Sequence, residues 1–425
     1  MGKHVVVVGG GIIGLCCAYY LSQSGHKVTV IDRGEASVEN CSFGNAGLVV
    51  PSHIVPLAAP GVVLAGIKWM RDPESPFYVK PRLAPDLVSW GWKFFRAGTK
   101  AHVERSAPLL RDLNMASRAA FEELDSQIGG FNFQKRGVLL LFKTAKGLEE
   151  ESHVVEMANR LGMPAEILDA TDTGKLDPAV RMDIEGAAFY PNDCHMSPGL
   201  LMQGIQRELV ANGVTFQWNR EVRDWKLDGR RISAAFTVSS RSGDAGEPEE
   251  IEADEWVLCG GSWSPQTARR LHLSLPMQAG KGYSVMLPKP KHQPSIPAIF
   301  AEARVVATPM GDTLRIAGTM EIAGLDDKVN PRRVRGILKA VPQYYPDFTE
   351  ADFEGLQAWA GLRPCSPDGL PYVGRTQRYE NLSVATGHAM MGLSLGPITG
   401  KLIAQTVGGG QPELSTELLN PDRYA

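Results

Sequence analysis

Residues 1–35 alternate between apolar and polar stretches in the order strand, helix, strand. The four valines at 5–8 form an apolar run with strand character, and glycines end the run. Residues 15–24 predict a helix, because Gly25 follows in the position of a C-terminal cap. The apolar run at 28–31 predicts a second strand. Together these segments predict a βαβ unit, which is typical of α/β folds.

The rest of the chain shows further helix and strand patterns without internal repeats. Helical spacing covers 85–124 and 148–161, and Ser197-Pro198 begins a helix that Gly213 ends. Strands are expected at 137–142, 214–218 and 256–259, a meander over 221–257 with an exposed acidic hairpin tip at 242–250, and one more helix from about residue 330. The strand before Gly260 resembles the opening arrangement and is expected in the same sheet. The residues between the two strands are then an insertion, so the domains are discontinuous.

The glycines after the first strand carry the clearest chemical signal. Gly9, Gly11 and Gly14 satisfy G-x-G-x-x-G, which allows a tight turn, a close approach of a pyrophosphate, and contact between helix and strand. The free N–H groups of the following helix would face the phosphates. Asp32 ends the second strand, where a carboxylate can accept hydrogen bonds from ribose hydroxyls. The pattern indicates a dinucleotide and leaves FAD and NAD open.

Composition and charge exclude several classes of protein. A chain of 425 residues is too long for one simple core and indicates two or three domains. The net charge of −3 gives no reason to expect a nucleic-acid partner. The six cysteines include no C-x-x-C pair, which favours a reduced, cytoplasmic setting, and no Cys/His group has metal-ligand spacing, so no metal is expected. Neither a signal peptide nor a transmembrane helix is expected.

Three further segments carry a resemblance that specifies the dinucleotide. They read NCSFGNAG at 40–47, GLRPCSPDGLPYVG at 361–374 and GHAMMGLSLGP at 387–397. With the opening motif they resemble the FAD-dependent D-amino-acid oxidase superfamily, and within it the bacterial D-amino-acid dehydrogenases of the small-subunit type. The resemblance spans Val5 to about Val407. Segment 387–397 is more similar to glycine, sarcosine or hydroxyproline oxidoreductases, which leaves the substrate open.

The resemblance implies an α/β fold with a Rossmann-type, glutathione-reductase-like FAD-binding domain and an α+β substrate-binding domain on an antiparallel sheet. The FAD-binding domain is expected at 1–65, 185–265 and 360–425, and the substrate-binding domain at 66–184 and 266–359. FAD is the implied cofactor. The residues expected to bind it are Gly9, Gly11, Ile12, Ile13, Gly14, Asp32, Arg33, Ser42, Asn45, Ala46, Gly47, Val222, Gly260, Gly261, Gly361, Gly387, His388, Met390, Met391, Gly392, Leu393 and Ser394.

The candidate substrate-binding residues begin with Arg363. Its planar guanidinium matches a carboxylate, and in the superfamily the arginine of this G-L-R-P element binds the substrate carboxylate. The alternative is a structural arginine paired with Asp368. Tyr283 and Tyr345 are candidates to close the site, and His195 is a candidate to line it. Gly396-Pro397 begins a helix whose N-terminus would stabilise a reduced, anionic flavin.

The implied reaction is the oxidation of a carbon–nitrogen bond of a small amino acid. Hydride transfer from Cα to flavin N5 gives an imino acid, which water converts to a keto acid and ammonia. A D-amino acid is the expected substrate; the alternative is a cyclic or secondary amine acid such as D-proline, D-hydroxyproline, sarcosine or glycine. An NAD(P)-dependent dehydrogenase and a non-catalytic flavin-binding subunit are competing hypotheses.

The electron acceptor is either a respiratory quinone or oxygen, and the oligomeric state is left open. The expected location is the cytoplasm, with peripheral contact at the inner face of the cell membrane as one option. The aromatic, partly basic stretch 90–96 would provide such a contact. The alternative, which we favour at this point, is that its aromatic side chains pack into the substrate domain.

Overall fold

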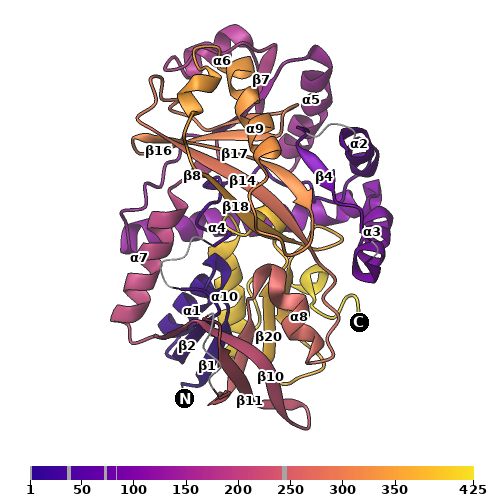
Figure 1. Cartoon of the computed structure of the whole chain (residues 1–425), viewed down its shortest axis with the longest axis vertical. Helices are drawn as coiled ribbons and strands as arrows, with labels where there is room; N and C mark the ends of the chain where they lie inside the picture. Colours follow the sequence, from indigo (N-terminus) through magenta and orange to yellow (C-terminus); the bar gives the residue numbers. More distant parts are fainter. Residues whose placement is uncertain (1, 36–39, 71–73, 83, 242–246) are drawn as a thin grey trace.

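The computed structural model describes residues 2–35, 40–70, 74–82, 84–241 and 247–425. Two large sheets lie at opposite ends of its long axis, and both chain termini lie near the first sheet (Figure 1). The predicted hairpin tip at 242–250 lies partly outside the described residues. In the part of the chain that the structure describes, no helix is long and apolar enough to cross a membrane.

The first sheet is built around the predicted βαβ unit. Its strands, in spatial order, are β19 (Tyr372–Arg375), β20 (Leu382–Thr386), β13 (Glu255–Leu258), β1 (His4–Val8), β2 (Lys27–Asp32) and β9 (Thr215–Trp218). All neighbours are parallel except β19 and β20. The strand before Gly260 therefore lies beside the first strand, as predicted. A separate antiparallel meander follows β9, formed by β10 (Arg220–Asp228), β11 (Arg231–Ser239) and β12 (Glu249–Glu252).

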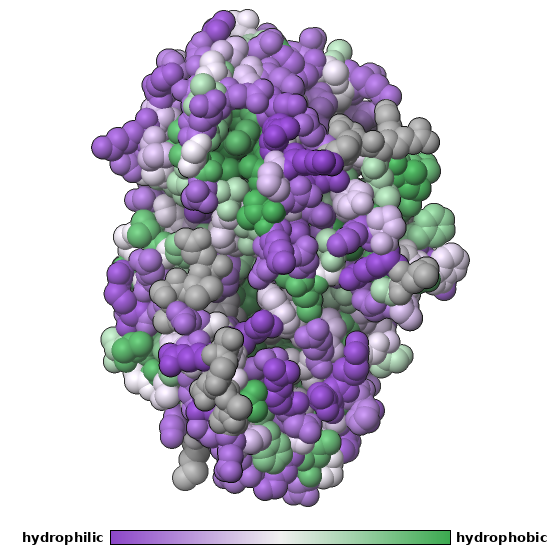
Figure 2. All heavy atoms as spheres, viewed as in Figure 1, coloured by the Kyte–Doolittle hydropathy of each residue, from purple (hydrophilic) through white to green (hydrophobic). Residues whose placement is uncertain are grey.

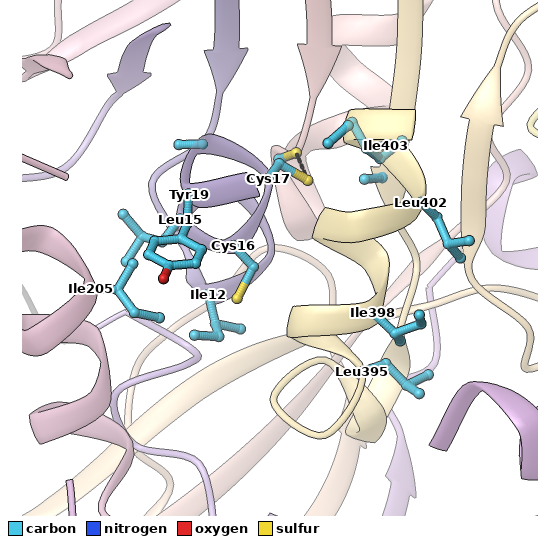
Figure 3. Packing of buried hydrophobic residues seen from close by; sticks show 14 of the residues in the cluster. Ile12, Leu15, Cys16, Cys17, Tyr19, Ile205, Leu395, Ile398, Leu402 and Ile403 are labelled. Carbon is cyan, nitrogen blue, oxygen red and sulfur yellow. Dashed lines mark hydrogen bonds between the residues drawn. The ribbon is translucent and has the colours of Figure 1, made fainter. Parts of the chain in front are cut away.

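Two helices far apart in the sequence pack together at the first sheet. They are α1 (Ile12–Gln23) and α10 (Gly396–Val407), and Figure 3 shows Cys16 and Cys17 on the side of α1 that faces α10. A Cβ at Gly400 would lie 2.5 Å from the carbonyl oxygen of Cys16, so the two helix backbones are in close contact. The start and the end of the chain thus share one hydrophobic core.

The second sheet has nine strands and is mostly antiparallel. Its spatial order is β18 (Ala358–Cys365), β14 (Gln278–Pro288), β17 (Thr313–Ile322), β16 (Val305–Met310), β15 (Ala298–Phe300), β5 (Val138–Phe142), β7 (Gly186–Tyr190) and β6 (Glu166–Asp169), with β4 (Phe77–Val79) beside β17. Helix α9 (Pro331–Tyr344) packs against one face of this sheet (Figure 1). Strands β7 and β18 lie here, although 185–265 and 360–425 are predicted as parts of the FAD-binding domain.

The remaining helices surround the two sheets. They are α2 (Val62–Trp69), α3 (Pro85–Ala97), α4 (Lys100–Gln127), α5 (Ala145–Arg160), α6 (Ala170–Leu176), α7 (Pro198–Ala211) and α8 (Ser264–Arg269). The pattern over 85–124 is two helices, because Gly98 and Thr99 end α3 and begin α4. Ser197 occupies the N-cap position of α7 as predicted, but its side chain makes no capping hydrogen bond. A two-stranded ladder joins β3 (Leu48–Val49) to β8 (Cys194–His195).

Candidate active site

A cavity of about 1350 Å³ lies between the two sheets. It is larger than the roughly 300–1,000 Å³ of most small-molecule sites. Its walls come from the turn after β1, the loop 40–53, the glycines after β13, strands β14 and β18, and the segment 388–394. Apart from β14 and residues 48–53, these segments are the ones that the sequence motifs single out, so the motifs meet in one cavity.

One end of the cavity is the glycine turn after β1. Gly9 has a φ of +120°, and a Cβ there would lie 2.4 Å from the carbonyl oxygen of Cys259, so this position tolerates no side chain. The Asp32 carboxylate lines the cavity and accepts hydrogen bonds from the backbone N–H groups of Gly10 and Gly34, each at 2.6 Å. The backbone thereby fixes the carboxylate in place. Ser42 Oγ accepts the first N–H of α1, that of Ile12, at 3.1 Å.

The loop 42–47 is anchored to the second sheet. Arg315 of β17 donates from Nη1 to the carbonyl oxygens of Phe43 at 2.9 Å and Asn45 at 2.6 Å. Ser284 Oγ of β14 donates to the carbonyl oxygen of Gly44 at 3.1 Å. Both anchors come from strands more than 200 residues later in the chain, so sequence analysis gave no sign of them.

Arg363 lies on β18 and also lines the cavity. Its Nη1 donates to the carbonyl oxygen of Thr319 at 2.6 Å, and burial lowers the pKa of the guanidinium from its ordinary value. Among the described residues, no carboxylate lies within salt-bridge distance of it. Asp368 instead forms two hydrogen bonds with Arg423, at 2.8 and 3.0 Å. The alternative pairing of Arg363 with Asp368 is therefore wrong.

A β-bulge makes room for the Arg363 guanidinium. Lys281 pairs with Glu321 and Tyr283 pairs with Gly318, so Gly282 of β14 faces two residues of β17. One of these two is Thr319, whose φ is +68°. A Cβ on Gly282 would lie 2.2 Å from Arg363 Nη2. The guanidinium thus occupies space that only glycine leaves free.

An apolar row of side chains lines the wall formed by the second sheet. Leu140, Ile299, Val306 and Ala317 are direct neighbours across β5, β15, β16 and β17, and all four line the cavity. Residues opposite one another in adjacent strands present their side chains on the same face. Residues next to them in the strands, such as Leu139 and Phe300, face the opposite way into a buried core. We call these four residues the apolar row.

Comparisons with known proteins identify the family. The model of the family described as FAD dependent oxidoreductase matches residues 4–406. The chain belongs to this FAD-dependent oxidoreductase family. It is 30% identical over 99% of its length to a D-amino acid dehydrogenase of Granulibacter bethesdensis and 32% identical over 99% to that of Paramagnetospirillum magneticum, covering 100% and 98% of those proteins.

Solved structures support the fold. A glycine oxidase from Geobacillus kaustophilus superposes with a TM-score of 0.78 over 100% of this chain and 99% of its own, at 22% identity. An L-proline dehydrogenase from P. horikoshii gives a TM-score of 0.75 over 100% of this chain and 98% of its own, at 16% identity. The predicted α/β fold with a Rossmann-type FAD-binding part is confirmed.

The cavity residues fit the FAD of this family. The glycine turn and the Asp32 carboxylate provide what the pyrophosphate and a ribose require. His388 lines the cavity, its Nε2 lies 3.0 Å from Thr399 Oγ1, and its buried Nδ1 has no hydrogen-bond partner among the described residues. Burial lowers the His388 pKa to about 3, so the imidazole is neutral at physiological pH. A polar group of a ligand in the cavity would satisfy Nδ1.

Most of the predicted FAD residues line the cavity. They are Gly9, Gly11, Ile12, Ile13, Asp32, Arg33, Ser42, Asn45, Ala46, Val222, Gly260, Gly261, Gly361, His388, Met390, Met391, Gly392, Leu393 and Ser394. Gly14, Gly47 and Gly387 lie just behind the lining, where Cβ atoms would meet Gly9, Met196 and Tyr372 respectively. The lining ends at Ser394, two residues before α10 begins.

The structure brings only one predicted tyrosine to the cavity. Tyr283 lines it, but its hydroxyl donates to Glu321 Oε2 at 2.5 Å. Tyr345 is 1% exposed and packs edge-on against Phe300, on the sheet face away from the cavity. His195 is buried behind β3, opposite Leu48, and burial lowers its pKa to about 4. Neither Tyr345 nor His195 is therefore in a position to contact a ligand in this cavity.

Sequence analysis missed a group of cavity residues on the side of the apolar row. Ser52, His53, Arg304 and Trp359 line the cavity beside the row. Trp359 lies against Gly44 and Gly361, where added Cβ atoms would be 2.2 and 2.0 Å from its ring. The available signal was Gly44 and Gly361, two glycines in the segments 40–47 and 361–374, but only the fold shows that the side chain of Trp359 occupies the space beside them.

Proposed function

We propose that this chain is a dehydrogenase that uses FAD to oxidise the Cα–N bond of a small D-amino acid. The observation that carries the proposal is Arg363, a half-buried arginine that lines the FAD cavity and has no carboxylate partner among the described residues. A substrate carboxylate would supply the missing negative charge. The names of the relatives that match over their full length support a D-amino acid.

We further propose how the cavity residues divide their work. The turn 9–14 and Asp32 would hold the pyrophosphate and a ribose of FAD, and the segment 388–394 would hold its flavin ring. FAD, when bound, accepts the two electrons of the Cα–H bond that breaks during oxidation. Arg363 binds the carboxylate and so fixes the orientation of Cα. The apolar row receives the substrate side chain.

The substrate amine enters as the neutral base, so the cavity needs no strong catalytic base. This fits the available groups, because the Tyr283 hydroxyl is hydrogen-bonded to Glu321 and the pKa of His388 is lowered to about 3 by burial. The product is an imino acid, which water converts to a keto acid and ammonia. A cyclic amine such as D-proline would give a cyclic imine.

We propose a membrane quinone as the electron acceptor. Two electrons and two protons from the substrate would convert the quinone to a quinol. The word dehydrogenase in the names of the relatives supports an acceptor other than oxygen. Reduction of oxygen to hydrogen peroxide is the alternative outcome of an acceptor assay.

Anaerobic reduction of the bound flavin tests the proposal. We expect D-amino acids to bleach the visible flavin bands and their L-enantiomers to leave them unchanged. Arg363→Lys keeps the charge but loses the paired donors, so the substrate concentration for half-maximal bleaching should rise roughly 10- to 100-fold, as expected for charge-assisted hydrogen bonds of about 1.5–3 kcal/mol. Arg181→Lys, at an exposed arginine paired with Asp347, is the matched control.

Three results would count against the proposal. Bleaching by no member of a panel of D-amino acids, D-proline, D-hydroxyproline, glycine and sarcosine would contradict the activity. Bleaching only by glycine or sarcosine would move the substrate class to the alternative. An Arg363→Lys enzyme with unchanged substrate dependence would remove the carboxylate role of Arg363.

A further inference from the structure

Helices α2 and α3 expose a concentration of large apolar side chains. The exposed fractions are 75% for Leu64, 56% for Ile67, 68% for Val88, 61% for Trp92 and 59% for Phe95. Both helices lie on the same side of the molecule, and Figure 2 shows hydrophobic side chains over α2 at that edge. We call these five residues the α2–α3 apolar surface. Apolar surfaces of this kind mark interaction sites on soluble proteins.

Helix α3 has two apolar stripes, and packing within the protein explains only one. Trp90 and Phe94 face inward and pack with Leu57, Cys365 and Met320. Val88, Trp92 and Phe95 follow the i, i+4, i+7 spacing of a second stripe, which faces solvent. A surface helix normally needs a single apolar stripe. The preference for inward packing of 90–96 is therefore right for Trp90 and Phe94 and wrong for Trp92 and Phe95.

The charge around this surface indicates what covers it. Over residues 77–105 the sequence has six basic residues, Lys80, Arg82, Lys93, Arg96, Lys100 and Arg105, and two acidic residues, Asp86 and Glu104. The formal balance of this segment is thus +4, whereas the whole chain carries −3. The basic charge is therefore concentrated in the segment that includes α3, where Arg82 and Lys100 lie within ion-pair distance of Asp86 and Glu104 and the other four basic residues make up the excess. Aromatic and aliphatic side chains flanked by Lys and Arg are typical of helices that lie in the interface of an anionic membrane.

We propose that the α2–α3 apolar surface docks onto an anionic lipid bilayer. A second copy of the chain is a poorer occupant, because a symmetric dimer would bring two patches of the same positive charge together. A bilayer with anionic headgroups offers both the apolar layer for Trp92 and Phe95 and the charge for the basic residues. Docking through this surface needs no transmembrane segment.

The docking surface is connected to the cavity by the helix itself. On the inner side of α3, Trp90 Nε1 donates to the carbonyl oxygen of Cys365 at 2.9 Å. Trp90 and Ala389 belong to the same small buried cluster, next to the cavity residue Met390. Docking would therefore place the flavin site close to the lipid phase. The benefit of this placement rests on the proposed quinone acceptor, whereas the docking itself does not.

Vesicle flotation of the purified FAD-loaded full chain tests the proposal. We expect the protein to float with vesicles of phosphatidylglycerol and phosphatidylcholine and to stay behind with pure phosphatidylcholine. The triple variant Val88→Ser, Trp92→Ser, Phe95→Ser should lose at least tenfold in partitioning to the anionic vesicles. A control triple variant, Leu200→Ser, Val210→Ser, Leu227→Ser, removes exposed apolar side chains from α7 and β10 and should float like the wild type.

The flavin spectrum and the reduction of a soluble dye acceptor report whether each variant is folded, and both should match the wild type. Wild-type protein that does not float with anionic vesicles would overturn the proposal, and so would a triple variant that floats unchanged. A wild-type dimer that the triple variant converts to monomer, without flotation, would assign the surface to a second copy instead. A flavin that no amino acid bleaches would contradict the proposed activity and leave the flotation result untouched.

Discussion

At the scale of single residues, the position of the Arg363 guanidinium depends on the space that the neighbouring residues leave for it. The G-L-R-P motif was enough to single out Arg363. The bulge that turns the Thr319 carbonyl toward it, and the missing side chain at Gly282, were not predictable, because β14, β17 and β18 are distant in the sequence and their register sets the contact. The motif therefore predicts which residue carries the positive charge, whereas only the fold shows where its guanidinium lies.

The substitution Gly282→Ala should weaken substrate binding without removing FAD. The added Cβ would meet Arg363 Nη2 at 2.2 Å and push the guanidinium out of place. We expect kcat/KM to fall at least about tenfold, or about 1.4 kcal/mol of transition-state stabilisation, with flavin content unchanged. Steady-state kinetics with a dye acceptor provide the measurement. Gly174→Ala, at a helix position with open space, is the control; unchanged kinetics in Gly282→Ala would show that Arg363 is not held by this contact.

The buried carboxyl of Asp193 should make stability fall as pH rises. It accepts hydrogen bonds from the Ser52 backbone N–H at 3.0 Å and from Ser52 Oγ, and burial raises its pKa to about 7. Because the folded pKa lies above the ordinary value of 3.8, the stabilising contribution is complete below about pH 4 and is lost as pH rises through about 7. The free energy of unfolding should fall less with rising pH in Asp193→Asn, because the asparagine side chain cannot ionise.

Urea unfolding of the two proteins at pH 5, 6, 7 and 8 measures the effect. The difference between their free energies of unfolding should shift in favour of the variant as pH rises. The exposed Asp228→Asn serves as the control and should track the wild type at every pH. A difference between Asp193→Asn and the wild type that is constant with pH would show that Asp193 does not titrate in this range.

At the scale of elements, the second sheet presents different chemistry on its two faces. The strand at 137–142 was predicted, but its apolar run does not reveal which residue faces a ligand. Leu139 and Leu141 are buried in the core, whereas Leu140 is half-buried in the cavity wall. Identical side chains thus have different roles, and the pairing of β5 with β15 decides between them.

The apolar row should determine the preference for the substrate side chain. Val306→Thr keeps the shape and adds a hydroxyl that a bound aliphatic side chain would desolvate, at a cost of about 1–3 kcal/mol. We expect the ratio of kcat/KM for D-valine to that for glycine to fall about fivefold or more. Ile167→Thr alters the far end of the same cross-strand row, outside the cavity, and should leave the ratio unchanged. Equal ratios in all three proteins would place the substrate side chain elsewhere.

At the scale of the whole molecule, the sequence predicted the first sheet better than the second. Three strands of the first sheet, β1, β2 and β13, have apolar runs that end in glycine or aspartate motifs, so they could be assigned together. The strands β7 and β18 pair in the nine-stranded sheet within segments assigned to the FAD-binding domain. Their partners lie far along the chain, and local patterns do not encode such pairings. The division into two discontinuous domains therefore stays a prediction.

The packing of α1 against α10 has a consequence for how the protein is made. During synthesis, the glycine turn and α1 leave the ribosome before β20 and α10 are translated. Until those late segments arrive, the buried faces of β1 and α1 lack the partners that cover them in the finished fold. For most of its synthesis, the nascent chain therefore exposes the apolar surfaces of β1 and α1 that these segments later bury, and molecular chaperones can bind such surfaces. The lining of the cavity is complete only when translation has passed Ser394.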